Sequence, residues 1–117
     1  MLPKSLTKYF STCFDSDLVN IDDRIDVMRA AERVGASISS LETPNGIHEA
    51  IDAVEGLLRN LDLEAVLELE RISNSSWSEE ERYVEYLRDA LQVVVERAKE
   101  KLADYEKTGA WVRPATS

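Results

Sequence analysis

The sequence of 117 residues contains one cysteine, Cys13, and one histidine, His48. A single cysteine cannot form a disulfide within the chain, and such sparing use fits a reducing compartment. A single histidine excludes the pair of Glu-x-x-His motifs that carboxylate-bridged di-metal sites in helical bundles require. These two absences argue against both a disulfide-stabilised fold and a di-metal centre.

Long hydrophobic runs are absent as well. No stretch approaches the roughly 18 apolar residues of a membrane span, and the N-terminal residues lack the apolar centre of a signal peptide. An apolar fraction of 44% and a charged fraction of 32% are typical of a folded, water-soluble protein. We therefore expect a cytoplasmic protein with a single helical domain over residues 1–117, in which residues 110–117 form a short C-terminal tail.

Apolar residues recur at intervals of three and four, the spacing that lines one face of an α-helix, and strand-like alternation is scarce. The first such face begins after Pro3, and the second is expected to start at an Asp17 N-cap and to stop at Gly35. Residues 36–40 are rich in serine and are expected to form a loop. The two apolar faces consist of Leu6, Tyr9, Phe10, Cys13 and Phe14, and of Leu18, Ile21, Ile25 and Met28.

The middle of the sequence contains two well-marked helix starts. Thr43 can cap a helix in which Pro44 occupies the first position, where its fixed φ is already helical. Asp62 is a second candidate N-cap, followed by another apolar stripe. Because Gly56 lies between the two starts and is a poor helix former, residues 44–72 could form one bent helix or two short ones.

The C-terminal third predicts a long helix. Ser78 opens the sequence Ser-Glu-Glu-Glu, which matches a capping box, and Gly109 is placed to end the helix. The apolar face has heptad spacing, which is typical of packing inside a bundle and also of a coiled-coil homodimer. The residues of this face are Val84, Leu87, Leu91, Val94 and Ala98. The sequence as a whole therefore predicts an all-α fold, a compact helical bundle of four to five amphipathic helices with a long C-terminal helix.

No recognisable catalytic set accompanies this fold. Cys13 would need a neighbouring base to act as a nucleophile, and nothing in the sequence brings His48 to it. We expect Cys13 in the core and His48 on the exposed side of its helix. A calcium loop is disfavoured because its sixth position lacks glycine, and helix capping explains the aspartates at its ligand positions, Asp15, Asp17, Asp23 and Asp26. The sequence therefore predicts no enzymatic activity, no cofactor and no metal site.

The negative charge is concentrated in one segment. Residues 42–81 contain eleven carboxylates and two basic residues, whereas the segments on either side are nearly neutral. Direct binding of nucleic acid is disfavoured, because affinity for phosphates comes from clustered lysine and arginine. An anionic helical surface can instead imitate the phosphate backbone and attract a cationic protein. We therefore expect a basic protein partner, and neither nucleic acid nor a membrane.

Two features make this segment a candidate binding surface. Glu64 and Glu68 are like charges one helical turn apart, an arrangement that costs a few tenths of a kcal/mol. Trp77 is an aromatic residue of the kind that anchors interfaces. With their acidic neighbours, the predicted partner-binding residues are Glu49, Asp52, Glu55, Asp62, Glu64, Glu68, Trp77 and Glu80.

In size, charge and helical character the chain is similar to small acidic proteins that neutralise a cognate toxin, such as bacterial immunity proteins, and to phage proteins that block host nucleic-acid enzymes. The sequence therefore predicts a non-enzymatic inhibitor or immunity-type protein that covers the basic site of a toxin, nuclease or nucleic-acid-binding enzyme. One alternative is a structural or adaptor subunit that self-associates as a homodimer through residues 79–107. Another is a small enzyme whose catalytic residues the sequence does not bring together.

Overall fold

The computed structural model describes residues 4–113 of the chain. In that range the chain is largely helical and contains no β-strand, and none of its helices has the length and hydropathy of a membrane span. The predicted all-α bundle with a long C-terminal helix is confirmed, while Pro3 and residues 114–117 lie outside the described residues. The elements are five α-helices and one 3₁₀-helix: α1 (Lys4–Cys13), α2 (Arg24–Leu41), α3 (Pro44–Arg59), α4 (Leu63–Ser73), η1 (Trp77–Glu79) and α5 (Glu81–Thr108).

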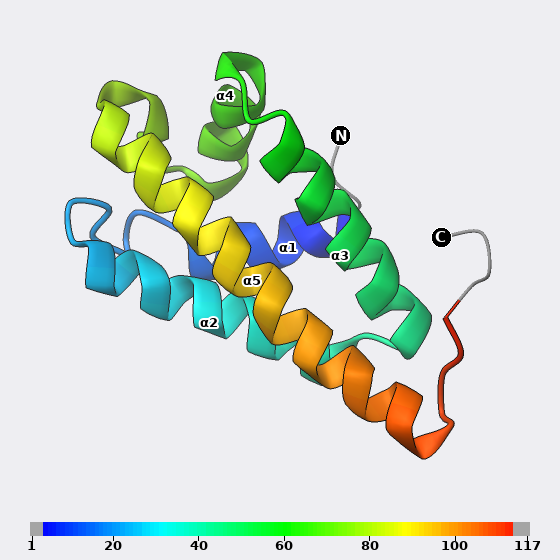
Figure 1. The fold of residues 1–117 in the computed structure, drawn as a ribbon. Coiled ribbons are helices and arrows are strands. Elements are labelled where there is room, and N and C mark those ends of the chain that lie inside the picture. Colours follow the sequence, from blue (N-terminus) through cyan, green and yellow to red (C-terminus); the bar gives the residue numbers. More distant parts are fainter. Residues whose placement is uncertain (1–3, 114–117) are drawn as a thin grey trace.

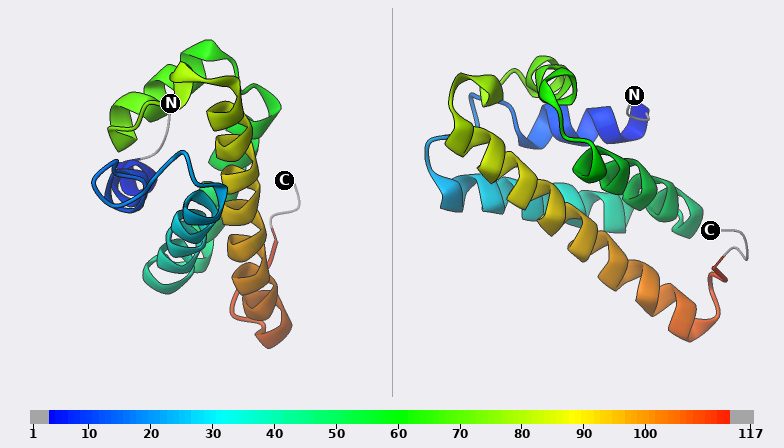
Figure 2. Two further views of the ribbon diagram at one scale, coloured as in Figure 1. Left: turned by 90° about the vertical axis from the view of Figure 1, so that its left-hand side faces the viewer. Right: turned by 45° about the horizontal axis from the view of Figure 1, so that its top comes forward.

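The longest helix, α5, runs the length of the molecule, and α2 and α3 pack along it (Figure 1). The described chain measures 44 × 25 × 21 Å. In contrast, α4 packs mainly against α1 and η1. Figure 2 shows α4 lying over α1, away from the C-terminal half of α5. The two acidic helices α3 and α4 are therefore held in place by different neighbours.

The apolar face of α5 forms the centre of the hydrophobic core. Leu87, Leu91 and Val94 are at most 1% exposed, and α2 and α3 flank the helix. Burying a leucine or valine side chain contributes about 1.5–3 kcal/mol relative to leaving it in water. The heptad residues at the centre of the predicted homodimer seam are therefore already buried within the chain.

The connection between α1 and α2 differs from the prediction. Asp17 does not cap a helix, and α2 is instead capped by Asp23, whose Oδ1 accepts a backbone hydrogen bond at 3.0 Å. Within the connection, the side chains of Asp15 and Asn20 each accept a hydrogen bond from the backbone N–H two residues further along, at 2.9 and 3.1 Å. Because such short polar side chains favour turns over helix, Leu18 is left 64% exposed outside any helix.

The predicted stop of α2 at Gly35 is also wrong, and α2 continues through Gly35 and the serine-rich residues 36–40. Gly35 marks a close approach between α2 and α5, because a Cβ on this residue would lie 2.6 Å from the Cβ of Arg97. Ile38, one turn beyond Gly35, is fully buried and continues the apolar face of α2. Gly35 therefore serves the packing of two helices and does not end one of them.

The start of α5 differs as well, since Ser78 does not form a capping box. The backbone N–H and the hydroxyl of Ser78 both donate to Oε2 of Glu70, at 2.9 and 2.7 Å. The N-cap of α5 is Glu80, whose side chain makes no capping hydrogen bond. Ser78 thus ties η1 to α4, because the acceptor for its two donors comes from α4.

The remaining helix boundaries are confirmed. Thr43 Oγ1 accepts a backbone hydrogen bond at 3.1 Å, and Pro44 is the first residue of α3. Asp62 caps α4 through a hydrogen bond of 2.9 Å, so α3 and α4 are two helices and not one bent helix. Gly109 ends α5 in the left-handed conformation, with φ of 77°. At each of these positions the capping group and its partner are close in sequence.

Replacing Gly35 with alanine is expected to lower the free energy of unfolding by about 1–3 kcal/mol, because the added methyl group overlaps Arg97. The control is Gly56→Ala in α3, where a Cβ would meet only Nη2 of Arg59, at 3.9 Å. This control should raise the free energy of unfolding by up to about 1 kcal/mol, since alanine favours a helix more than glycine does. Urea denaturation measures both changes, and an unchanged stability of Gly35→Ala would contradict the close approach of α2 and α5.

The burial of Leu87, Leu91 and Val94 also predicts the oligomeric state. With its apolar face already covered, α5 should not pair with a second copy, and light scattering at micromolar concentration should give a mass of 13.2 kDa. The helix content, followed by circular dichroism, should not change on dilution. A doubled mass together with a helix content that falls on dilution would instead favour self-association through α5.

Candidate protein-binding surface

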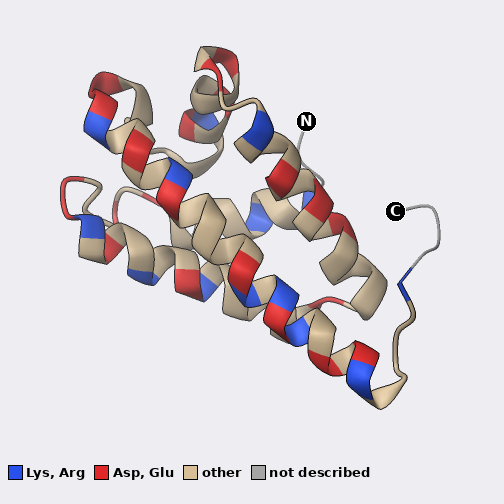
Figure 3. Cartoon of the chain, viewed as in Figure 1, with Lys and Arg blue, Asp and Glu red and all other residues tan. Residues whose placement is uncertain are grey.

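The structure brings four of the predicted partner-binding residues to one groove between α3 and α4, called here the α3–α4 groove. Glu64 and Glu68 lie one turn apart on α4, and the short connection of residues 60–62 joins this helix to the C-terminal end of α3. Figure 3 shows acidic positions on both helices. The groove has a volume of about 380 Å³, and the carboxylates that line it are Asp52, Asp62, Glu64 and Glu68.

The charges of the α3–α4 groove are largely uncompensated. No lysine or arginine lines it, and neither Glu64 nor Glu68 forms an ion pair within residues 4–113. Asp62 Oδ1 accepts the capping hydrogen bond of α4, and Asp52 lies 3.5 Å from Nε2 of His48. A groove with like charges on both sides attracts cations, because low-dielectric walls focus the field within it.

Three further predicted residues lie outside the groove. Glu49 is exposed on α3. Glu55 does not line the groove, and its Oε2 forms an ion pair with Nζ of Lys99 on α5, at 2.9 Å. Glu80 is paired with Arg82, through Nε and Oε1 at 3.1 Å. The charges of Glu55 and Glu80 are therefore used within the chain, whereas that of Glu49 extends the acidic surface along α3.

Trp77 is a core residue and does not lie on the predicted surface. Its side chain is fully buried, and its ring packs edge-on against Phe14 with the ring centroids 5.8 Å apart. The indole Nε1 donates to Oγ of Ser73 at 3.0 Å, and this hydroxyl donates in turn to the carbonyl of Leu69 at 2.6 Å. A buried indole N–H needs a hydrogen-bond acceptor. The only sign in the sequence that Trp77 could be buried is Ser73, which lies one helical turn upstream and can supply that acceptor.

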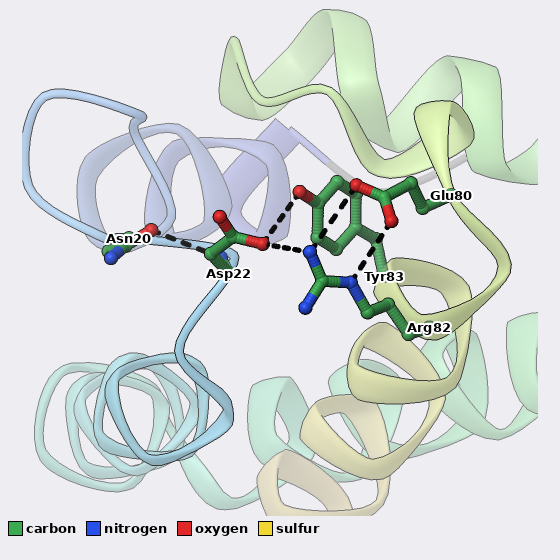
Figure 4. Close-up of polar contacts among 5 residues, drawn as sticks. All are labelled: Asn20, Asp22, Glu80, Arg82 and Tyr83. Carbon is green, nitrogen blue, oxygen red and sulfur yellow. Dashed lines mark hydrogen bonds and ion pairs between the residues drawn. The ribbon is translucent and has the colours of Figure 1, made fainter.

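A second polar cluster, which sequence reasoning missed, joins the α1–α2 connection to the start of α5 (Figure 4). Oδ1 of Asp22 accepts hydrogen bonds from Nη2 of Arg82 and from the hydroxyl of Tyr83, the latter at 2.8 Å. Arg82 also donates to Glu80, and the backbone N–H of Asp22 donates to Oδ1 of Asn20. Because Asp22 and Arg82 are far apart in sequence, no local pattern could reveal this cluster.

The charges of this cluster shift the pKa values of its members. The hydrogen bond to Asp22, reinforced by Glu80, raises the pKa of Tyr83 to about 12, since a phenolate would face two carboxylates. The hydrogen bond from Arg82 lowers the pKa of Glu80, and the same contact raises the pKa of Arg82. Near neutral pH Tyr83 therefore stays neutral while Glu80 and Arg82 stay charged, and the hydrogen bonds of Asp22 join the α1–α2 connection to the start of α5.

The candidate nucleophile and base are not brought together. Cys13 is buried on α1, and burial raises the pKa of its thiol despite an opposing contribution from Arg33, which disfavours the reactive thiolate. His48 was expected on the exposed side of α3, but only 16% of its side chain is exposed. It packs under Trp111, with the ring centroids 5.3 Å apart, and the Trp111 indole donates to Asn45 at 2.9 Å. His48 therefore holds the C-terminal segment against α3.

Among residues 4–113, no group of three or more histidine, cysteine or carboxylate side chains is arranged to hold a metal ion. The aspartates of the disfavoured calcium loop instead bind backbone N–H groups, as Asp15, Asp23 and Asp26 each do. Carboxylates that are used as caps and turn acceptors do not converge on one point. In the α3–α4 groove, by contrast, Glu64 and Glu68 have no ion-pair partner among the described residues.

Comparison of the chain with known protein families gives no match, and neither do comparisons with curated proteins and with solved structures. The function therefore has to be argued from the surface itself.

The shifted pKa of Tyr83 predicts an alkaline loss of stability. Its ordinary pKa is 10.0, and the folded pKa of about 12 is higher, so the folded state retains the phenolic proton in this interval. The stabilisation from neutral Tyr83 is fully present below pH 10 and is lost as the pH rises through about 12. Ultraviolet titration should show that Asp22→Asn lowers the pKa of Tyr83, with Tyr83→Phe identifying the signal. An unaltered titration in Asp22→Asn would contradict this contact.

Proposed function

We propose that this protein is a non-enzymatic binding protein whose acidic surface on α3 and α4 covers the basic site of a nuclease or of another protein that handles nucleic acid. The observation that carries this proposal is the α3–α4 groove, in which Asp52, Glu64 and Glu68 gather without a lysine or arginine among the lining residues. A site that naturally binds phosphates is cationic, and a rigid anionic surface can compete for it.

The physical advantage of this surface is that its charges are fixed on helices. Glu64 and Glu68 project from one side of α4, and Asp52 projects from α3. Charges held on rigid elements need little ordering when a partner binds, which reduces the entropic cost of association. Such a field also steers a cationic partner, so that encounter is fast at low ionic strength. In this proposal the protein acts in the cytoplasm, in keeping with its single cysteine.

The adaptor alternative, self-association through residues 79–107, has less support. Leu87, Leu91 and Val94 would form its seam, and all three are buried in the core of the chain. Pairing through this face would require α5 to leave α2 and α3, which would expose the apolar surface of those helices. We therefore favour the inhibitor, and its partner class is a basic toxin, nuclease or nucleic-acid-binding enzyme.

Charge reversal on α4 tests the proposal. The double variant Glu64→Lys and Glu68→Lys should slow association with the basic partner by about tenfold at low salt, because it inverts the field of the groove. Stopped-flow or surface-based kinetics at several ionic strengths measure the rate. For the unaltered protein, the association rate should fall steeply as salt is added, since screening removes the long-range attraction.

The matched control is Glu96→Lys with Glu100→Lys, a pair that is also one turn apart but lies on α5. There Glu100 is already paired with Arg97 at 3.4 Å, and Glu96 accepts a hydrogen bond from Gln92 at 3.4 Å. The control should alter the association rate far less than the α4 pair. Equal losses for both pairs, or binding that is independent of salt, would overturn the electrostatic inhibitor and favour the adaptor.

A further inference from the structure

We infer that α3 carries a second binding site, in which the ring of the chain's own Trp111 is an exchangeable occupant whose place an indole group from outside can take. The site, called here the Trp111 site, is formed by Asn45 and His48 in the first two turns of α3. Neither residue lines the α3–α4 groove. The inference therefore goes beyond the proposed function and does not depend on it.

The Trp111 site is complementary to both parts of an indole. Only 7% of Trp111 is exposed, although this residue belongs to no helix. Its Nε1 donates to Oδ1 of Asn45 at 2.9 Å, and its ring lies against the imidazole of His48 with the centroids 5.3 Å apart. An indole has a large apolar body and a single N–H donor. The start of α3 thus covers the apolar body and accepts a hydrogen bond from the donor.

The segment that carries Trp111, residues 110–113, is called here the C-terminal strap. It follows the left-handed Gly109 and turns back from the end of α5 toward the start of α3 (Figure 1). Among residues 4–113, its backbone hydrogen bonds run from Ala110 and Trp111 to the carbonyl of Tyr105, at 2.9 and 3.3 Å, and none reaches α3. Val112 is 81% exposed. The ring can therefore leave α3 without breaking a backbone hydrogen bond to that helix.

An unfilled cavity borders the Trp111 site. It has a volume of about 310 Å³, lies between α3 and α5, and is lined by His48, by Arg113 of the strap and by apolar residues of both helices. Arg113 pairs with Glu106 at 3.2 Å, and both side chains are partly exposed, so the pair contributes at most about 1 kcal/mol. Because His48 borders both spaces, lifting of the strap would join them into one site. That site has room for an indole that carries a substituent.

The tether sets how strongly Trp111 competes with a ligand. A side chain on a short flexible linker is present at its site at an effective concentration in the millimolar range. A ligand with the intrinsic affinity of Trp111 therefore needs a similar concentration to displace it, and a tighter ligand needs less. Without a ligand the strap closes the Trp111 site, which makes the strap an autoinhibitory contact.

The first test is a titration of the ¹⁵N-labelled full chain with indole, followed by NMR. The chain has two tryptophans, so each indole N–H signal can be assigned. The Trp111 signal should move toward the position of a solvent-exposed indole, whereas the Trp77 signal should stay, because its Nε1 is buried against Ser73. A Trp111 signal that does not move at about 10 mM indole, in excess of a millimolar effective concentration, would overturn the inference.

Variants of the full chain sharpen this test. Trp111→Ala removes the tethered competitor and should bind indole at least about tenfold more tightly than the unaltered chain. This variant should bind N-methylindole, which lacks the N–H donor, about fivefold more weakly than indole, because Asn45 loses its partner. Val112→Ala, in the same strap, is the matched control and should bind indole as the unaltered chain does. Equal binding of indole by Trp111→Ala and the control, or equal binding of the two compounds, would overturn the Trp111 site.

Should Trp111→Ala fail to fold, Asn45→Ala takes its place. The Trp111 signal of that variant should lie closer to the position of an exposed indole before any indole is added, because the ring has lost its acceptor. An unchanged Trp111 signal in Asn45→Ala would overturn the inference as well.

A second probe distinguishes two sources of the indole. A capped peptide with the strap sequence Ala-Trp-Val-Arg presents the same ring with a backbone and with an arginine that can pair with Glu106. If Trp111→Ala binds the peptide more tightly than indole, the site takes a tryptophan of a protein segment, and if it binds both equally, the site takes a small indole compound. Binding of neither probe would overturn the inference. The proposed function is tested separately, by charge reversal on α4, and does not depend on this result.

Discussion

The packing of α5 between α2 and α3 is the interaction on which the rest of the structure depends. Leu91 and Val94 are completely buried at its centre, and Gly35 lets α2 approach α5 where a larger residue would overlap Arg97. Because α3 also packs along α5, this packing fixes one side of the acidic groove. The other side, α4, is placed by a different set of contacts.

Those contacts are the apolar packing of Val66 and Leu69 in the core and hydrogen bonds around the connection from α4 to α5. Oγ of Ser75 donates to the carbonyl of Phe14 at 2.7 Å, and Trp77 donates to Ser73, so the connection is tied both to the residue that follows α1 and to α4. These donors are buried, and each would destabilise the fold if it lost its acceptor. The two sides of the groove are thus supported by different neighbours, which are mainly α5 for α3 and mainly α1 and η1 for α4.

The helix boundaries that were predicted correctly are those fixed by residues close together along the chain. Thr43, Asp62 and Gly109 act within one helical turn, so their boundaries could be read directly. Gly35 and Ser78 are also residue types that favour helix ends, but in the folded chain Gly35 packs against Arg97 and Ser78 donates hydrogen bonds to Glu70. These contacts with residues from other helices determine what the two residues do. For the binding surface, the acidic pairs on α4 were predictable from spacing, whereas the groove was not, because its width depends on how two helices lie against each other.

The separate support of α3 and α4 has a consequence for motion. Helices can open locally without unfolding of the whole chain, and α4 packs mainly against α1 and η1 and not along α5. Local opening of α4 would widen the groove without disturbing α5. A partner that bridges Asp52 on α3 and Glu68 on α4 would link two units that pack against different neighbours. Binding would then suppress that opening, and the two units would exchange their amide hydrogens as one.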